Sequence, residues 1–177
     1  DTSVKIGDTL TLRAGAAGSA LVPGFLTRQI DPQSFSSLGA LFDEPFWVFY
    51  NKVAFADNPV EYLAQLNGKR VAVGLRGSGS QALALQLLAD NGITPENTTM
   101  LELPRQAESQ QLVAGEIDAV LLLDAYQSES VQALLRAPEV GLANLAQADA
   151  YAARQHALKV VDLPEGVIDL GANTQLL

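Results

Sequence analysis

The chain contains no cysteine, and aromatic residues make up only 6% of it. The first absence excludes disulfides, thiolate metal ligands and cysteine nucleophiles. No apolar run approaches the roughly 18 residues that a membrane-spanning helix needs. Because aromatic side chains are few, alanine, leucine and valine must fill the core, as is common where helices pack closely on a sheet.

Basic residues are also few. Eleven Lys and Arg stand against twenty Asp and Glu, which gives a formal net charge of −9. The basic residues are scattered along the sequence and form no stripe. Binding to a nucleic-acid backbone requires a basic face that displaces counterions, so we expect no nucleic-acid partner.

The chain has a single histidine, His156. No carboxylates or cysteines accompany it at ligand spacing, so the pattern favours a helix end at the surface over metal binding or catalysis. No set of nucleophile, base and orienting residue can be assembled from the sequence, which counts against a hydrolase. The sequence therefore predicts no catalytic residue, no metal and no cofactor.

From about residue 45 onward, segments typical of strands alternate with segments typical of helices. Strands are predicted at 46–50, 69–73, 98–103, 117–123, 140–145 and 158–162. Helices are predicted at 59–66, 80–91, 105–113, 131–135 and 147–156. This alternation predicts an α/β fold built of right-handed βαβ units, with a mostly parallel sheet and helices on both faces. The first forty residues predict one or two short strands only.

The sharpest local feature is the segment 74–80, Gly-Leu-Arg-Gly-Ser-Gly-Ser, which follows a predicted strand and opens a predicted helix. The start of a helix presents unpaired backbone N–H groups and a partial positive charge. The glycines let the main chain approach an anion, and Ser78 and Ser80 add hydroxyl donors. Gly77, Ser78, Gly79 and Ser80 therefore form a candidate carboxylate or phosphate site. The alternative is a tight structural turn in which Ser80 caps the helix.

The glycine spacing excludes the two common phosphate motifs. No lysine precedes the last serine, as a Walker motif requires, and the order of the glycines does not fit G-x-G-x-x-G. Ligands of open parallel sheets gather beyond the carboxyl ends of the strands. Asp124 and Tyr126, which follow a predicted central strand, are therefore candidates for the same cleft, against the alternative of a loop aspartate and a half-buried tyrosine.

Other polar residues are weaker candidates. Glu44 and Asp118 also lie near predicted strand ends, and Glu102, Glu108 and Glu116 are expected to be solvated. The aromatic residues Trp47, Phe49 and Tyr50 are expected to serve in core or hinge packing.

Taken in order, several segments resemble the TAXI group of TRAP-transporter solute receptors. The matching segments are SLGALFDEPFWVFY (37–50), LNGKRVAVG (66–74), GSGS (77–80), AL (82–83), AGEIDA (114–119) and LPEGVIDL (163–170). The resemblance extends over roughly residues 38–170. It implies a type II periplasmic-binding-protein fold, a two-lobed clamp that closes on a small acidic solute, such as an amino or organic acid, and delivers it to the permease subunits of a membrane transporter.

The resemblance also implies a division of the chain and a location. Residues 1–50 would be a partial first lobe with a hinge strand, 51–170 a second α/β lobe, and 171–177 the start of a return to the first lobe. The receptor would work in the periplasm or elsewhere outside the cytoplasm. Two alternatives use the same architecture: the ligand-binding effector domain of a transcriptional regulator, and an enzyme on the same fold.

Overall fold

The computed structural model describes residues 6–13, 43–155 and 158–163. The described helices are α1 (Gly79–Asp90), α2 (Arg105–Val113), α3 (Glu129–Arg136) and α4 (Ala148–Arg154), with short 3-10 helices η2 (Val53–Phe55) and η3 (Leu63–Leu66). The described strands are β1 (Ile6–Arg13), β2 (Asp43–Asn51), β3 (Arg70–Ala72), β4 (Thr99–Leu101), β5 (Ala119–Leu123), β6 (Val140–Leu142) and β7 (Leu158–Leu163). Each predicted strand coincides with an observed one, and β1 supplies a strand in the N-terminal region. None of the described helices is both long and apolar enough to cross a bilayer.

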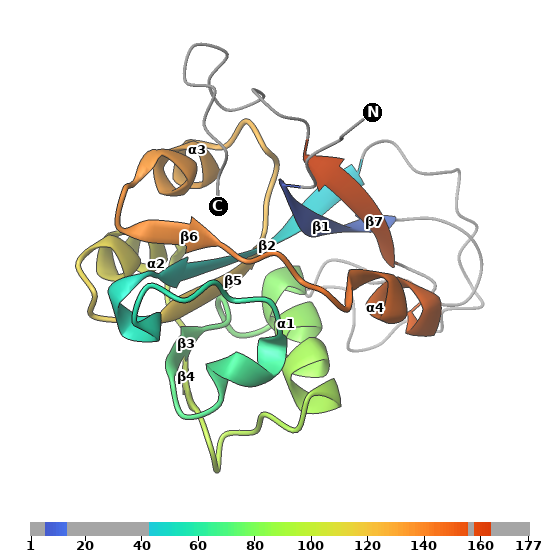
Figure 1. Cartoon of the computed structure of the whole chain (residues 1–177), viewed down its shortest axis with the longest axis horizontal. Helices are drawn as coiled ribbons and strands as arrows, with labels where there is room; N and C mark the ends of the chain where they lie inside the picture. The colour runs from blue at the N-terminus through green and yellow to red at the C-terminus, as the bar shows by residue number, and fades with distance from the viewer. Residues whose placement is uncertain (1–5, 14–42, 156–157, 164–177) are drawn as a thin grey trace.

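The strands form one sheet in the order β4-β3-β5-β2-β1-β7, with β6 also paired to β2 (Figure 1). The α/β class and the helices on both faces are confirmed, but the prediction of a mostly parallel sheet is wrong for the described strands. Only β3–β4 and β3–β5 are parallel pairs. β2 runs antiparallel to β1, β5 and β6, and β1 is antiparallel to β7. Alternation of elements along a chain does not reveal the direction in which an inserted strand runs.

Two hydrophobic clusters cover the two faces of this sheet. One contains residues of α1 and α4, and the other contains residues of α2 and α3. Successive residues of β2 point to opposite faces, because strand side chains alternate. Phe46, Val48 and Tyr50 therefore enter the first cluster, while Trp47 and Phe49 enter the second. The aromatic segment is core, as predicted, and it lies at the centre of the sheet.

One predicted helix is largely absent. The segment 59–66 was expected to be helical, with Pro59 in its first turn, but only Leu63–Leu66 forms a 3-10 helix. The side chain of Gln65 accepts hydrogen bonds from the amides of Glu61 and Tyr62, both at 2.8 Å, and donates to the Pro59 carbonyl at 3.2 Å. These contacts satisfy the backbone in an extended form, so the apolar spacing of the segment does not produce a full helix.

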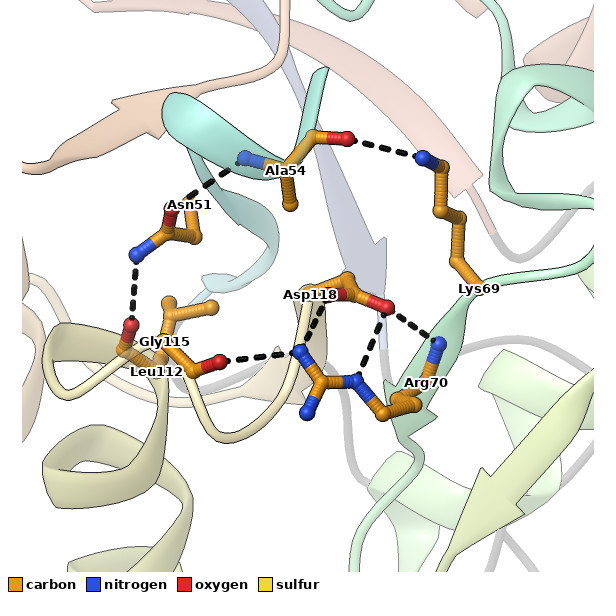
Figure 2. Close-up of polar contacts among 7 residues, drawn as sticks. All are labelled: Asn51, Ala54, Lys69, Arg70, Leu112, Gly115 and Asp118. Carbon is orange, nitrogen blue, oxygen red and sulfur yellow. Dashed lines mark hydrogen bonds and ion pairs between the residues drawn. The ribbon is translucent and has the colours of Figure 1, made fainter. Parts of the chain in front are cut away.

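The amino ends of the parallel strands are joined by a polar network (Figure 2). Asp118, just before β5, accepts hydrogen bonds from the amide of Arg70 at 2.7 Å and from its guanidinium at 2.7 and 3.2 Å. The same guanidinium donates to the Gly115 carbonyl at 2.8 Å, and the Asn51 side chain donates to the Leu112 carbonyl at 3.0 Å. Asp118, a weak candidate for the ligand site, therefore belongs to a structural network at the edge opposite the 74–80 turn.

Candidate functional site

The 74–80 turn connects the end of β3 to the start of α1. Gly74 and Gly77 have φ values of +88° and +79°, a conformation that glycine adopts without strain. A side chain at Gly74 would also lie 3.1 Å from Ser78 Oγ and 3.1 Å from Ser80 Cβ, so the turn folds tightly over this residue. The backbone therefore requires glycine at position 74 both for its conformation and for close packing.

Ser78, and not Ser80, caps α1. Its hydroxyl oxygen accepts a hydrogen bond from the amide of Gln81 at 3.1 Å, as expected for a residue just before a helix. Ser80 is buried, and its Oγ accepts from the Leu123 amide at 3.0 Å. The same Oγ lies 3.5 Å from the Leu123 carbonyl, to which it donates. The Ser80 hydroxyl thus fixes the start of α1 to the end of β5.

The side chain of Gln81 accepts a hydrogen bond from another backbone amide of the turn. It is 8% exposed, and its Oε1 accepts from the amide of Gly77 at 2.8 Å. Its Nε2 donates to Glu102 Oε1 at 2.9 Å. Within the described residues, the amides of Gly79 and Ser80 donate to no acceptor. The turn therefore offers two adjacent unpaired N–H groups, at the first two residues of α1.

Asp124 lies directly after the β5 residue that Ser80 contacts. Its carboxylate forms an ion pair with Arg105, the first residue of α2, and the side chains of the two are 18% and 40% exposed. The Asp124 carbonyl accepts a hydrogen bond from Trp47 Nε1 at 2.9 Å. An arginine has five N–H donors, so a partly exposed guanidinium that already holds one carboxylate can still donate to another anion.

Tyr126 is half-buried and packs against the hydrophobic cluster that contains α2 and α3. The Gln132 side chain donates to its carbonyl at 2.9 Å. Tyr126 therefore lies beside Asp124 in the loop between β5 and α3, and its ring serves in packing.

Glu108 was expected to be solvated, and this prediction is wrong. The residue is only 2% exposed, on the face of α2 that packs against the sheet. Burial raises the pKa of its carboxyl to about 7, against the opposing effects of the nearby Arg105 charge and of a hydrogen bond from the Gly74 backbone. Its Oε1 has no hydrogen-bond partner among the described residues. Glu102 and Glu116 are exposed, as predicted.

These contacts form a closed ring at the carboxyl ends of β3, β4 and β5. Gly74 packs under Ser80, Ser80 holds the residue before Asp124, Asp124 pairs with Arg105, and Glu108 contacts Gly74. Parallel sheets bind ligands at this edge. We call this ring, with the free amides of Gly79 and Ser80, the candidate site.

The structure thus brings the predicted segment 77–80 and Asp124 together and adds Gln81, Arg105 and Glu108. A signal for Arg105 and Glu108 existed, since both lie in the first turn of a helix that follows a parallel strand. No group of three or more acidic, histidine or cysteine side chains suited to a metal is found in the described part of the chain.

The chain belongs to the NMT1-like family, whose model matches residues 27–169. No curated protein matches the sequence significantly. Among solved structures, the chain is similar to the periplasmic aliphatic sulphonate binding protein SsuA from Escherichia coli, with 19% identity, a TM-score of 0.48, and coverage of 66% of this chain and 34% of that one.

Two other structures show a similar level of likeness. An ancestral arginine-binding protein bound to arginine has 19% identity and a TM-score of 0.44, with 70% of this chain and 45% of that one covered. The regulatory domain of CcmR from Synechocystis PCC6803 in complex with 2-PG has 18% identity and a TM-score of 0.45, with 59% and 48% covered. The chain thus spans less than half of each of these proteins, and likenesses this weak identify neither a ligand nor a partner.

Proposed function

We propose that this chain is part of a solute-binding receptor, and that it binds a small carboxylate without catalysing a reaction. The observation that carries the proposal is the pair of unpaired amides at Gly79 and Ser80, at the carboxyl edge of the parallel strands. Gly77, Ser78, Gly79 and Ser80 form the binding turn, and Asp124 and Tyr126 line the same edge.

The physical basis is electrostatic. Aligned peptide dipoles place roughly half a positive charge at the start of α1, where an anion is stabilised. Charge-assisted hydrogen bonds from backbone amides to a carboxylate are stronger than neutral ones. Two neighbouring N–H groups suit the two oxygens of a carboxylate, and Arg105 supplies a nearby cation that is still partly exposed. The chain as a whole has a formal net charge of −9, so a region of positive potential contrasts with its overall charge.

The finer assignment is to a TRAP-type transporter of the TAXI group, working in the periplasm or otherwise outside the cytoplasm with membrane permease subunits. Its support is the ordered set of segments that resembles this group, together with membership of the NMT1-like family over much the same residues. In this proposal, residues 51–170 form the second lobe of a clamp, 1–50 contribute part of the first lobe and the hinge strand, and 171–177 return to the first lobe. The antiparallel course of β2 through the sheet suits a strand that enters from another lobe.

A proline at position 79 tests the proposal directly. Gly79 is the first residue of α1, where proline is well tolerated, and the preceding Ser78 has φ −78° and ψ 157°, which suits a residue before proline. Gly79→Pro therefore removes one free N–H while α1 is retained. Gly79→Ala is the matched control, because it keeps the N–H and its Cβ would meet only Leu123 Cδ1, at 3.9 Å.

The measurement is an NMR titration of ¹⁵N-labelled protein with acetate, L-glutamate and succinate, which detects millimolar binding. In the wild type and in Gly79→Ala, we expect the Ser80 amide to shift in a saturable manner. In Gly79→Pro, we expect binding at least about tenfold weaker, the equivalent of losing one charge-assisted hydrogen bond. Equal affinities in the alanine and proline variants, or no saturable shift in the wild type, would rule out the turn as the binding site.

A further inference from the structure

Glu108 is a buried carboxyl whose hydrogen bonding is incomplete. It is 2% exposed, and its Oε1 has no partner among the described residues. A buried polar atom without a partner costs free energy, and such atoms are rare in folded proteins. The neighbouring cation does not remove this cost, because the guanidinium of Arg105 forms its ion pair with Asp124. A role in stability therefore does not account for Glu108.

The position of Glu108 connects it to the binding turn. Its carboxyl faces the backbone N–H of Gly74, which lowers the pKa of the carboxyl. Ser78 and Ser80, the residues on either side of Gly79, lie close over Gly74, since a Cβ at Gly74 would be 3.1 Å from each of them. Glu108 and the turn that carries the free amides thus share Gly74 as a neighbour, and a negative charge on Glu108 opposes an anion bound at those amides.

We propose that Glu108 is the proton-carrying group of the candidate site, so that an anionic solute binds together with one proton. The inference rests on the proposed function and adds its regulation: the receptor holds its carboxylate more tightly in mildly acidic than in mildly alkaline surroundings. When Glu108 carries a proton, the charges that the described residues place around the bound anion belong to two ion pairs, Arg105–Asp124 and Arg76–Glu102. When Glu108 is ionised, the site holds a further negative charge, which Arg105 offsets only in part because it is already paired with Asp124.

The charged groups around Glu108 indicate that its carboxyl titrates by itself, without coupling to a second titrating group. On its own helix, Arg105 is the charge that acts on it. The elements packed against α2 carry Asp124 after β5, Glu44 on β2, and Glu129 and Arg136 on α3. The shift in the pKa of Glu108 comes instead from burial, the Arg105 charge and the Gly74 backbone. Burial places this pKa at about 7, so the proton is exchanged near neutrality. A bound anion favours the neutral form and raises the pKa further, which is the thermodynamic counterpart of tighter binding at lower pH.

Titration calorimetry with acetate and L-glutamate tests the linkage, because both probes keep their carboxylates ionised between about pH 6 and about pH 8.5. For the wild type we expect the dissociation constant to rise by about tenfold over this range, which corresponds to a pKa change of about one unit on binding. Near pH 7, the observed heat should vary with the ionisation enthalpy of the buffer, since binding takes up protons. Glu108→Gln keeps an acceptor for Gly74 but cannot ionise, and it should bind with a constant that varies by less than about twofold. Glu116→Gln, an exposed control, should behave as the wild type.

The outcomes separate the two proposals. If the wild type binds neither probe at any pH, the proposed function fails and this inference fails with it. If the wild type binds but its affinity does not depend on pH, or if Glu108→Gln retains the dependence, only the inference is overturned. A titration of the Glu108 carboxyl by ¹³C NMR in the wild type needs no variant: its midpoint must rise in the presence of saturating probe, and an unchanged midpoint overturns the inference.

Discussion

Two buried acidic residues, Asp118 and Glu108, show how differently the same chemistry is used within this chain. Both lie near strand ends, and both are largely inaccessible to solvent. Asp118 accepts three hydrogen bonds from Arg70, whereas one oxygen of Glu108 accepts none among the described residues. Accordingly, burial raises the pKa of Asp118 but the hydrogen bonds and charge of Arg70 outweigh it, and the net shift is downward. Asp118 is therefore ionised, and its role is to stabilise the fold.

Replacement of Asp118 by asparagine should therefore destabilise the fold in a pH-dependent manner. Asp118→Asn should lower the free energy of unfolding at pH 7 by about 1–3 kcal/mol, since hydrogen bonds to a charged group are lost from a buried position. A lowered pKa means that this stabilisation is present above the ordinary aspartate range, near pH 4, and is lost as the pH falls through the folded-state value. Urea unfolding from about pH 7 down to about pH 3 measures the effect.

Glu61→Gln, at an exposed position, is the control for this experiment and should leave the unfolding free energy within about 0.5 kcal/mol of the wild type. A gap between Asp118→Asn and the wild type that stays constant down to low pH would show that the charge of Asp118 does not stabilise the native state.

The sequence does not distinguish these two residues. Each is a single acid within an otherwise ordinary segment, and their environments depend on contacts distant along the chain: Arg70 is 48 positions from Asp118. The same holds for Gln81, whose side chain accepts a hydrogen bond from the Gly77 amide. Sequence patterns indicate where backbone amides are exposed, but they do not show which side chain folds back onto them.

At the scale of elements, the turn before α1 was the most predictable part of the molecule. Its glycines, its place after a strand and the apolar residues that follow predicted a helix start at this point, and α1 begins at Gly79. What could not be predicted was the role of each serine, because Ser78 and Ser80 are equally good caps by residue type. The choice follows from β5, whose Leu123 amide takes the Ser80 hydroxyl as its acceptor.

The two left-handed glycines of this turn should differ in their tolerance of a side chain. Gly77→Ala adds a methyl group with no atom within 4 Å, so it should cost only the strain of a positive φ, about 1 kcal/mol. Gly74→Ala incurs the same strain and also forces apart Ser78 and Ser80, each 3.1 Å from the new carbon. We expect a loss at least about 1 kcal/mol greater than for Gly77→Ala. Thermal unfolding of the two variants, compared side by side, measures this difference, and equal losses would show that the close packing over Gly74 is unimportant.

At the scale of the whole molecule, β2 connects the two hydrophobic clusters. Its alternate residues enter opposite clusters, and β5 pairs with it over Phe46 to Tyr50. This arrangement explains why the alternating pattern predicted the α/β class but not the mixed sheet: strand direction is decided by the position of β2 between β5 and β6, a long-range feature. The division at residue 50 likewise remains a prediction, although β2 is central to the sheet.

Because both clusters share β2, the described sheet should unfold as one unit. Trp47, the single tryptophan of the chain, is 1% exposed and reports on the cluster with α2 and α3. Far-ultraviolet circular dichroism reports on all the helices. In urea, the fluorescence and dichroism transitions should coincide, as expected for a cooperative domain of this size. Separate midpoints would show that the two faces are held together less tightly than their shared strand implies.

The opposite placement of the two polar networks has a consequence for how such a protein can diversify. The Arg70–Asp118 contacts join the amino ends of the strands, while Gln81, Arg105 and Glu108 gather at the carboxyl ends. Substitutions that are well separated and share no partners have nearly additive effects on stability. Substitutions at the carboxyl ends of the strands can therefore change ligand preference, while the contacts at the amino ends continue to stabilise the fold.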